Sequence, residues 1–76
     1  MNKYCYIEAP DDAWAEIKTI TATSYEHAVE KLILKYSERY SSDNNIVDID
    51  TFEDLQDYLN DNYGLQVADL RDIETL

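Results

Sequence analysis

The apolar stripe of residues 25–40 limits what this chain can fold into more than any other feature. Apolar side chains recur there at spacings of three and four, which places them along one side of an α-helix. A helix with one apolar side must bury that side against another layer. Thr23, followed three residues later by Glu26, fits a capping box, and Ser24 is the rival N-cap. The stripe comprises Tyr25, Ala28, Val29, Leu32, Ile33, Tyr36 and Tyr40, and Leu34 lies outside it.

Two segments before this helix have the pattern of β-strands. Residues 3–9 alternate, with Cys5, Ile7 and Ala9 on one face and Tyr4, Tyr6 and Glu8 on the other. The turn residues Pro10-Asp11-Asp12 separate them from a second strand at residues 14–22, which predicts a hairpin. If the helices cover the Cys5 face, Tyr4 and Tyr6 stand on the open face. Tyrosine is favoured at protein interfaces, so both are candidate partner-binding residues.

A second amphipathic helix is predicted between residues 50 and 64. Phe52, Leu55, Tyr58 and Leu59 recur at helical spacing, either Asp50 or Thr51 is the N-cap, and Gly64 follows as a left-handed C′ residue. Just before it, Ile46, Val47 and Ile49 form a short strand or anchor the loop. Residues 65–75 fit both a strand and a helix. We favour a third strand, because a two-stranded hairpin alone is marginally stable.

These elements predict an α+β fold with the order ββααβ. A small, mainly antiparallel sheet would carry both helices on one face. The 76 residues hold no repeat and no linker, so residues 1–76 should form a single domain. A hydrophobic content of 45% supports a packed core despite the high charge.

The formal net charge of −11 is concentrated in the second half of the chain. Residues 1–42 carry seven acidic and five basic side chains, whereas residues 43–76 carry ten acidic side chains and only Arg71 as a base. Direct binding to nucleic acid or to an anionic membrane needs a basic surface, so both are disfavoured. A cationic partner is favoured. The alternative is that the charge serves only solubility.

Aspartates form a row on the second predicted helix. Asp50, Asp54, Asp57 and Asp61 are spaced four, three and four residues apart, and Glu53 adds a fifth carboxylate. Like charges at that spacing repel one another, and no lysine or arginine lies among them. The helix dipole favours the acids of the first turn but not Asp61 at the far end. We therefore predict that Asp50, Glu53, Asp54, Asp57 and Asp61 bind a partner; a solvated helix face is the alternative.

Metal and catalytic sites are not predicted. Asp43-x-Asn45 begins like an EF-hand loop, but Asp48 stands where glycine is required and Asp54 where glutamate is required. The single histidine, His27, reads as an exposed helix residue, and the single cysteine, Cys5, as a core residue. One glycine cannot build a phosphate-binding loop. We expect a non-enzymatic protein without a cofactor or a bound metal.

The localisation expected from the sequence is cytoplasmic. A lone cysteine cannot form an internal disulfide, which fits a reducing compartment. Neither a signal peptide nor a membrane-spanning segment is recognisable.

The order of elements and the acidic second half together resemble the small accessory proteins of bacteriophages and mobile elements. The resemblance is carried by WAEIKTITATSYEHAVEKL (14–32) leading into DIDTFEDLQDYLNDNYG (48–64). Acidic members of that class include anti-restriction and anti-CRISPR proteins, some of which act as DNA mimics. The resemblance implies an inhibitor in the host cell cytoplasm, and it assigns no role to an individual residue.

The predicted function is therefore a binding protein that blocks the basic, nucleic-acid-binding surface of a host protein. The alternative is a small structural or assembly module that acts by scaffolding or by self-association, for example as a homodimer.

Overall fold

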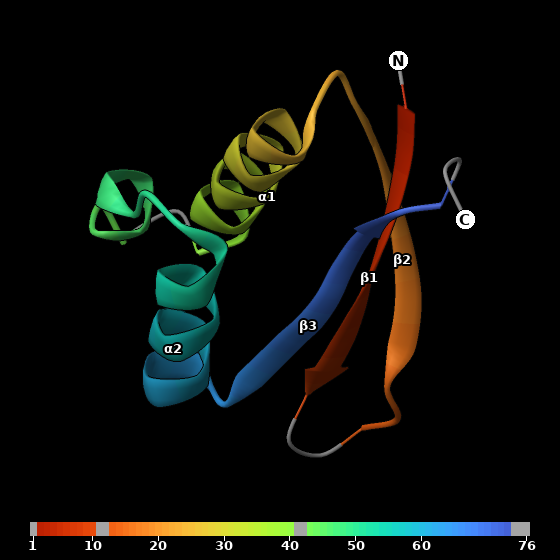
Figure 1. The fold of residues 1–76 in the computed structure, drawn as a ribbon. Helices are drawn as coiled ribbons and strands as arrows, with labels where there is room; N and C mark the ends of the chain where they lie inside the picture. Colours follow the sequence, from red (N-terminus) through yellow and green to blue (C-terminus); the bar gives the residue numbers. More distant parts are fainter. Residues whose placement is uncertain (1, 11–12, 41–42, 74–76) are drawn as a thin grey trace.

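The computed structural model describes residues 2–10, 13–40 and 43–73. It confirms the α+β class and the order ββααβ, with both helices on one face of one sheet (Figure 1). Of the two predicted N-caps of the first helix, Thr23 and Ser24, it is Ser24 that forms the cap, and its side chain accepts a hydrogen bond from the His27 backbone N–H. The elements are β1 (Asn2–Pro10), β2 (Glu16–Ala22), α1 (Tyr25–Arg39), the 3₁₀ turn η1 (Ile46–Asp48), α2 (Phe52–Tyr63) and β3 (Leu65–Asp72).

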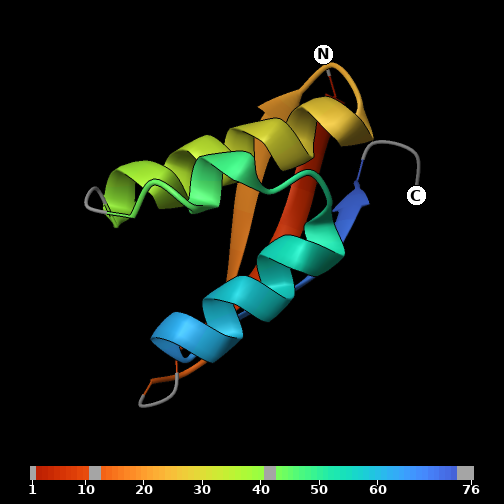
Figure 2. The ribbon, with the colours of Figure 1, turned by 90° about the vertical axis from the view of Figure 1, so that its left-hand side faces the viewer.

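The sheet is antiparallel, with the strand order β2-β1-β3. β1 is therefore the central strand, and Ile7 lies opposite Ile17 on one side and Ala68 on the other. Seen after a quarter turn, α1 and α2 both lie in front of the same face of the sheet (Figure 2). α1 packs on the β2 side and α2 on the β3 side, so the opposite face of the sheet carries no helix.

The helices cover the tyrosine face of β1, which corrects the expected placement of Tyr4 and Tyr6. Their side chains are only 4% and 1% exposed, and Glu8 beside them is also buried. Cys5 and Ile7 are the residues that point to the uncovered face, where they are partly exposed. The physical reason is that tyrosine buries a larger apolar area than cysteine, provided that its hydroxyl finds a partner. Tyr6 finds one, because Lys35 Nζ donates to its hydroxyl at 2.8 Å.

The core lies between the two helices and this face of the sheet. α1 contributes the centre of its predicted stripe, while Tyr25 at one end is 47% exposed and Leu34 points to solvent as expected. α2 contributes Leu55 and Leu59, both fully buried. Ile46 of η1 is also fully buried, so the segment before α2 is a loop anchor and not a strand. The α1 residues in the core are Ala28, Val29, Leu32, Ile33 and Tyr36.

The second helix and the third strand are bounded by local signals in the sequence. Thr51 is the N-cap of α2 and accepts from the Asp54 backbone N–H. Gly64 ends the helix in the left-handed conformation, with φ 64°, as the sequence predicts. β3 follows directly and contains an irregularity in its register against β1, where Asp69 adopts φ 57°. An extra residue of this kind is a β-bulge, and it turns Leu70 inward out of phase with Leu65 and Val67.

Candidate partner-binding surface

The acidic row of α2, which we define as Asp50, Glu53, Asp54, Asp57 and Asp61, is exposed along its whole length. The buried side of the helix is formed by Leu55 and Leu59, so the carboxylates point away from the core. No ion pair or side-chain hydrogen bond involves any of the five carboxylates within the described residues. The row is therefore free to contact another molecule.

The basic side chains are held elsewhere, which explains why the row stays unneutralised. The Nζ atoms of Lys31 and Lys35 donate to the Thr21 carbonyl oxygen and to the Tyr6 hydroxyl, respectively. Arg39 Nη1 lies 2.8 Å from Glu8 Oε1. All three cations thus hold α1 to the hairpin, and none of these bonds reaches α2.

The fold adds two glutamates to the N-terminal end of the row. A depression of about 340 Å³ between α1 and the start of α2 is lined by Glu26, Glu30 and Asp50, with Val29 and Phe52 among its apolar walls. Glu30 and Asp50 also line a neighbouring depression of about 370 Å³. Their helical spacing puts Glu26 and Glu30 on one edge of α1, but the sequence carries no signal for how the two helices are oriented. The row and these two glutamates form one anionic surface.

A cluster around Asp43 fixes the C-terminal half of α2 against the end of α1. The Tyr58 hydroxyl donates to Asp43 Oδ2 at 2.6 Å, and the Tyr63 hydroxyl donates to the same oxygen. Tyr63 also stacks on Tyr40, with ring centroids 3.8 Å apart. The hydrogen bonds from the two tyrosines lower the pKa of Asp43, and the bond to Asp43 raises the pKa of Tyr63 to about 12. These contacts therefore hold Asp57 and Asp61, on the same half of α2, in a fixed position relative to the end of α1.

The same cluster occupies the carboxylate of Asp43, the residue at which the EF-hand-like pattern of the sequence begins. Its carboxylate accepts from two tyrosines and from the Asn45 backbone N–H. Among residues 2–10, 13–40 and 43–73, no group of three or more histidine, cysteine, aspartate or glutamate side chains could hold a metal ion.

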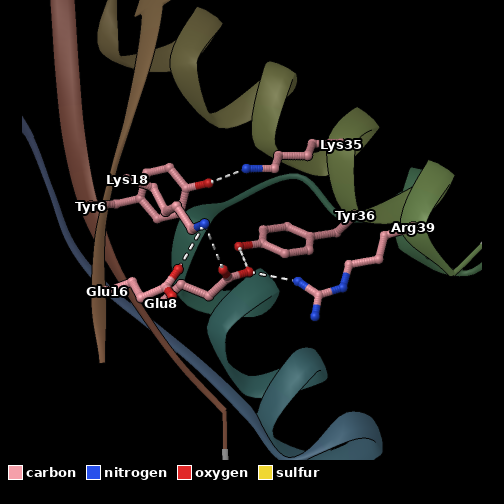
Figure 3. A network of polar contacts seen from close by, with 7 residues as sticks. All are labelled: Tyr6, Glu8, Glu16, Lys18, Lys35, Tyr36 and Arg39. Carbon is pink, nitrogen blue, oxygen red and sulfur yellow. Dashed lines mark hydrogen bonds and ion pairs between the residues drawn. The ribbon is translucent and has the colours of Figure 1, made fainter. Parts of the chain in front are cut away.

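A second polar constellation, centred on the buried carboxylate of Glu8, joins α1 to the sheet (Figure 3). The Tyr36 hydroxyl donates to Glu8 Oε1 at 2.9 Å, and Arg39 reaches the same oxygen. Lys18 Nζ lies 3.9 Å from Glu8 Oε2, and Lys35 Nζ lies 5.5 Å from the Tyr6 ring centre. Burial is the main reason that the pKa of Tyr36 is raised, so its hydroxyl remains a hydrogen-bond donor and not a nucleophile.

The Glu8 constellation is a structural anchor rather than a binding site. Figure 3 shows the side chains of α1 and of the hairpin pointing toward one another, and Glu8 between them is only 6% exposed. No buried side-chain nitrogen or oxygen among the described residues lacks a hydrogen-bond partner. The sequence did not predict this network. Glu8 shares a face of the first strand with Tyr4 and Tyr6, and that face was expected to be uncovered.

The seven candidate partner-binding residues therefore fall into two groups. All five carboxylates are exposed; Glu53, Asp54, Asp57 and Asp61 lie on α2, whereas Asp50, expected on the same helix, directly precedes its N-cap Thr51. Tyr4 and Tyr6 lie in the core, so their side chains cannot meet a partner without unfolding of the helical layer. The exposed aromatic residue on the hairpin is instead Trp14, which is 91% exposed.

Comparisons with protein-family models, curated proteins and solved structures found no match to this chain. Within the described residues, no helix is both long and apolar enough to cross a membrane.

Proposed function

We propose that this protein is a non-enzymatic binding protein whose acidic row on α2 covers a basic, nucleic-acid-binding surface of another protein. The observation that carries the proposal is the set of five exposed carboxylates, four on α2 and Asp50 just before its N-cap, none of which has a cationic partner among the described residues. A helix selected for stability alone would gain from lysine or arginine at the intervening positions.

The spacing of the row supports a resemblance to a nucleic-acid strand. With a rise of about 1.5 Å per residue, the three aspartates of the row that lie on α2 (Asp54, Asp57 and Asp61) are roughly 4.5–6 Å apart along the helix axis. Phosphates follow one another along one strand of B-DNA at about 3.4 Å of axial rise. A groove that binds phosphates with several arginines or lysines can therefore meet several carboxylates of the row together. The first-turn acids also gain from the helix dipole, whereas Asp61 at the C-terminal end is opposed by it.

Inhibition of nucleic-acid binding is the activity that this surface would have. A partner whose basic groove is occupied by α2 loses access to DNA or RNA until the complex dissociates. The accessory proteins of phages and mobile elements that this chain resembles act in this way in some cases. The host cytoplasm is the compartment in which such a partner would be met.

The experiment compares two charge-matched triple variants as baits in bacterial lysate. The first carries Asp54→Asn, Asp57→Asn and Asp61→Asn on α2. The control carries Glu16→Gln, Glu38→Gln and Asp69→Asn, which removes the same charge from exposed positions outside the row. Glu26 and Glu30 are unsuitable as controls because they border the row. Circular dichroism confirms that each variant is folded.

The readout has two stages, capture of a partner and inhibition of that partner. We expect the wild type and the control to capture a DNA- or RNA-binding protein, and the α2 variant to lose it. Purified wild type should then release that protein from its nucleic acid in a gel-shift assay, with an effect that weakens at high salt, because exposed charges are screened within about 8–10 Å. Equal loss in both variants would assign the binding to net charge. A shift of DNA by this protein alone would refute the proposal.

A further inference from the structure

The face of the sheet that carries no helix leaves apolar side chains uncovered. Ile7 on β1 lies directly opposite Ile17 on β2, and Ile17 is 77% exposed. Cys5 follows along β1, with Thr19 opposite it. Cys5, Ile7 and Ile17 border a shallow depression of about 340 Å³ that also reaches Asp69 and Arg71 on β3. Ile7 and Ile17 form a cross-strand pair, but that pair still leaves most of the Ile17 side chain uncovered.

Charge is nearly absent from this face, in contrast to the rest of the molecule. Arg71 is the β3 partner of Cys5, and its Nη2 atom lies 3.7 Å from Asp69 Oδ1, so the two charges offset each other. Lys3 adds one further cation at the end of β1. Among residues 2–10, 13–40 and 43–73, two basic side chains and one acidic side chain therefore stand on this open face of the sheet, within a protein whose net charge is −11. It is the face on which another anionic molecule meets the least repulsion.

We propose that the open face of the sheet, defined by Cys5, Ile7, Ile17, Thr19 and Arg71, is where two copies of this chain associate. A second copy is the occupant that fits, since it offers the same weakly charged apolar surface and is itself strongly anionic elsewhere. The interface would be isologous, with the same strands contributed by each copy around a two-fold axis. A basic partner, in contrast, would be attracted to the anionic helical side of the molecule.

The arrangement of layers keeps the anionic surfaces of the two copies apart. Packed sheets lie about 10 Å from each other, and each helical layer adds about 8–10 Å on the outside. The two α2 helices would thus be roughly 26–30 Å apart, about three Debye lengths at physiological ionic strength. Association through α1 or α2 would instead bring two acidic rows into contact. The dimer would present one acidic row on each of its outer sides.

The area of the open face determines how strong the association of two copies should be. Three strands about 4.8 Å apart and about eight residues long, at about 3.3 Å per residue, span roughly 380 Å² in projection. Both copies together would bury about 800 Å² or somewhat more, which is below the 1,200–2,000 Å² or so of a stable interface. The dimer should therefore be reversible and dissociate on dilution.

Sedimentation velocity from micromolar to near-millimolar concentration, at physiological ionic strength, measures this association. We expect the wild type to convert from monomer to dimer within that range. Ile17→Arg should be monomeric throughout, because an arginine on each copy would place like charges within the interface. The matched control is Leu34→Arg, which adds the same charge at another exposed aliphatic position, on the solvent side of α1, and should dimerise like the wild type.

Amide chemical shifts over the same dilution series locate the interface independently of any substitution. We expect shifts at Ile7, Ile17 and Arg71 and none along α2. A wild type that is monomeric at every concentration would overturn the proposal. So would a dimer that Ile17→Arg leaves intact, or one whose concentration-dependent shifts lie on α1 or α2. Because the acidic row lies on the opposite side, a monomeric result would leave the proposed inhibitory function standing.

Discussion

Replacing Tyr36 with phenylalanine tests whether the buried carboxylate of Glu8 anchors α1 to the sheet. The Tyr36 side chain is fully buried, and its hydroxyl donates to Glu8 Oε1 at 2.9 Å. Phenylalanine keeps the ring and leaves almost no cavity, so the change removes mainly one hydrogen bond. Bonds to charged groups contribute about 1.5–3 kcal/mol. Glu8 retains Arg39, so we expect a loss of about 1.5–2 kcal/mol, at the lower end of that range.

The size of the domain converts this loss into a large change in melting temperature. For a chain of this length, 1 kcal/mol corresponds to about 4–8 °C, so Tyr36→Phe should lower Tm by about 6–16 °C. The control is Tyr25→Phe in the first turn of the same helix. Tyr25 is 47% exposed and its hydroxyl bonds to no described residue, so its loss should change stability by less than about 0.5 kcal/mol.

A double-mutant cycle isolates the Tyr36–Glu8 bond from the packing of the ring. Glu8→Leu leaves the Tyr36 hydroxyl buried without its acceptor, which costs about 1–3 kcal/mol. Arg39 then turns to solvent, and Lys18 keeps its ion pair with Glu16 at 2.9 Å. Combining Glu8→Leu with Tyr36→Phe removes both polar groups, so the double variant should be less destabilised than the sum of the single variants by about 1–2 kcal/mol. Urea denaturation followed by circular dichroism measures all four proteins, and additivity within about 0.5 kcal/mol would refute the anchor.

Two further predictions concern pH and salt. The hydrogen bond to Asp43 raises the pKa of Tyr63 from 10.0 to about 12. A tyrosine whose pKa is higher in the folded than in the unfolded protein stabilises the fold at pH values below its unfolded pKa, so stability should fall between about pH 10 and pH 12. A Tyr63→Phe variant with an identical fall in Tm over that range would contradict this. Repulsion within the acidic row should make Tm at neutral pH rise with added NaCl, because salt screens the charges. The rise should be smaller in the variant that carries Asp54→Asn, Asp57→Asn and Asp61→Asn. A wild-type Tm that falls with added NaCl would contradict net repulsion.

The elements could be predicted because their signals are local. The stripe on α1, the cap and C′ glycine of α2 and the alternation of β1 each depend on residues within a few positions of one another. The third strand was harder, since Val67, Leu70 and Ile73 have helical spacing. The β-bulge at Asp69 is the cause: one extra residue shifts the inward phase of the strand and imitates a period of three.

The covered face of the sheet could not be predicted, because the choice depends on contacts distant in sequence. Both faces of β1 carry β-formers, and Cys5 and Ile7 have the more apolar side chains. Tyr6 and Glu8 can be buried only because α1 brings Lys35 and Arg39 to their oxygens, 29 and 31 residues further along the chain. An alternating strand gives two faces, and the residues that satisfy the polar groups of one face decide which is covered.

Half of the basic side chains of the protein surround the buried polar groups of Tyr6 and Glu8. These cations therefore do not neutralise the carboxylates on the surface of α2. Lys18, Lys35 and Arg39 surround Glu8 and Tyr6, and Lys31 is bound to the Thr21 carbonyl oxygen. α2 is packed through Leu55, Leu59 and the tyrosine contacts to Asp43, so it needs no cation. Its exposed carboxylates are therefore not required by the fold. They can be changed as a set without touching the core, which makes the acidic row on α2 the place where function and stability can be measured separately.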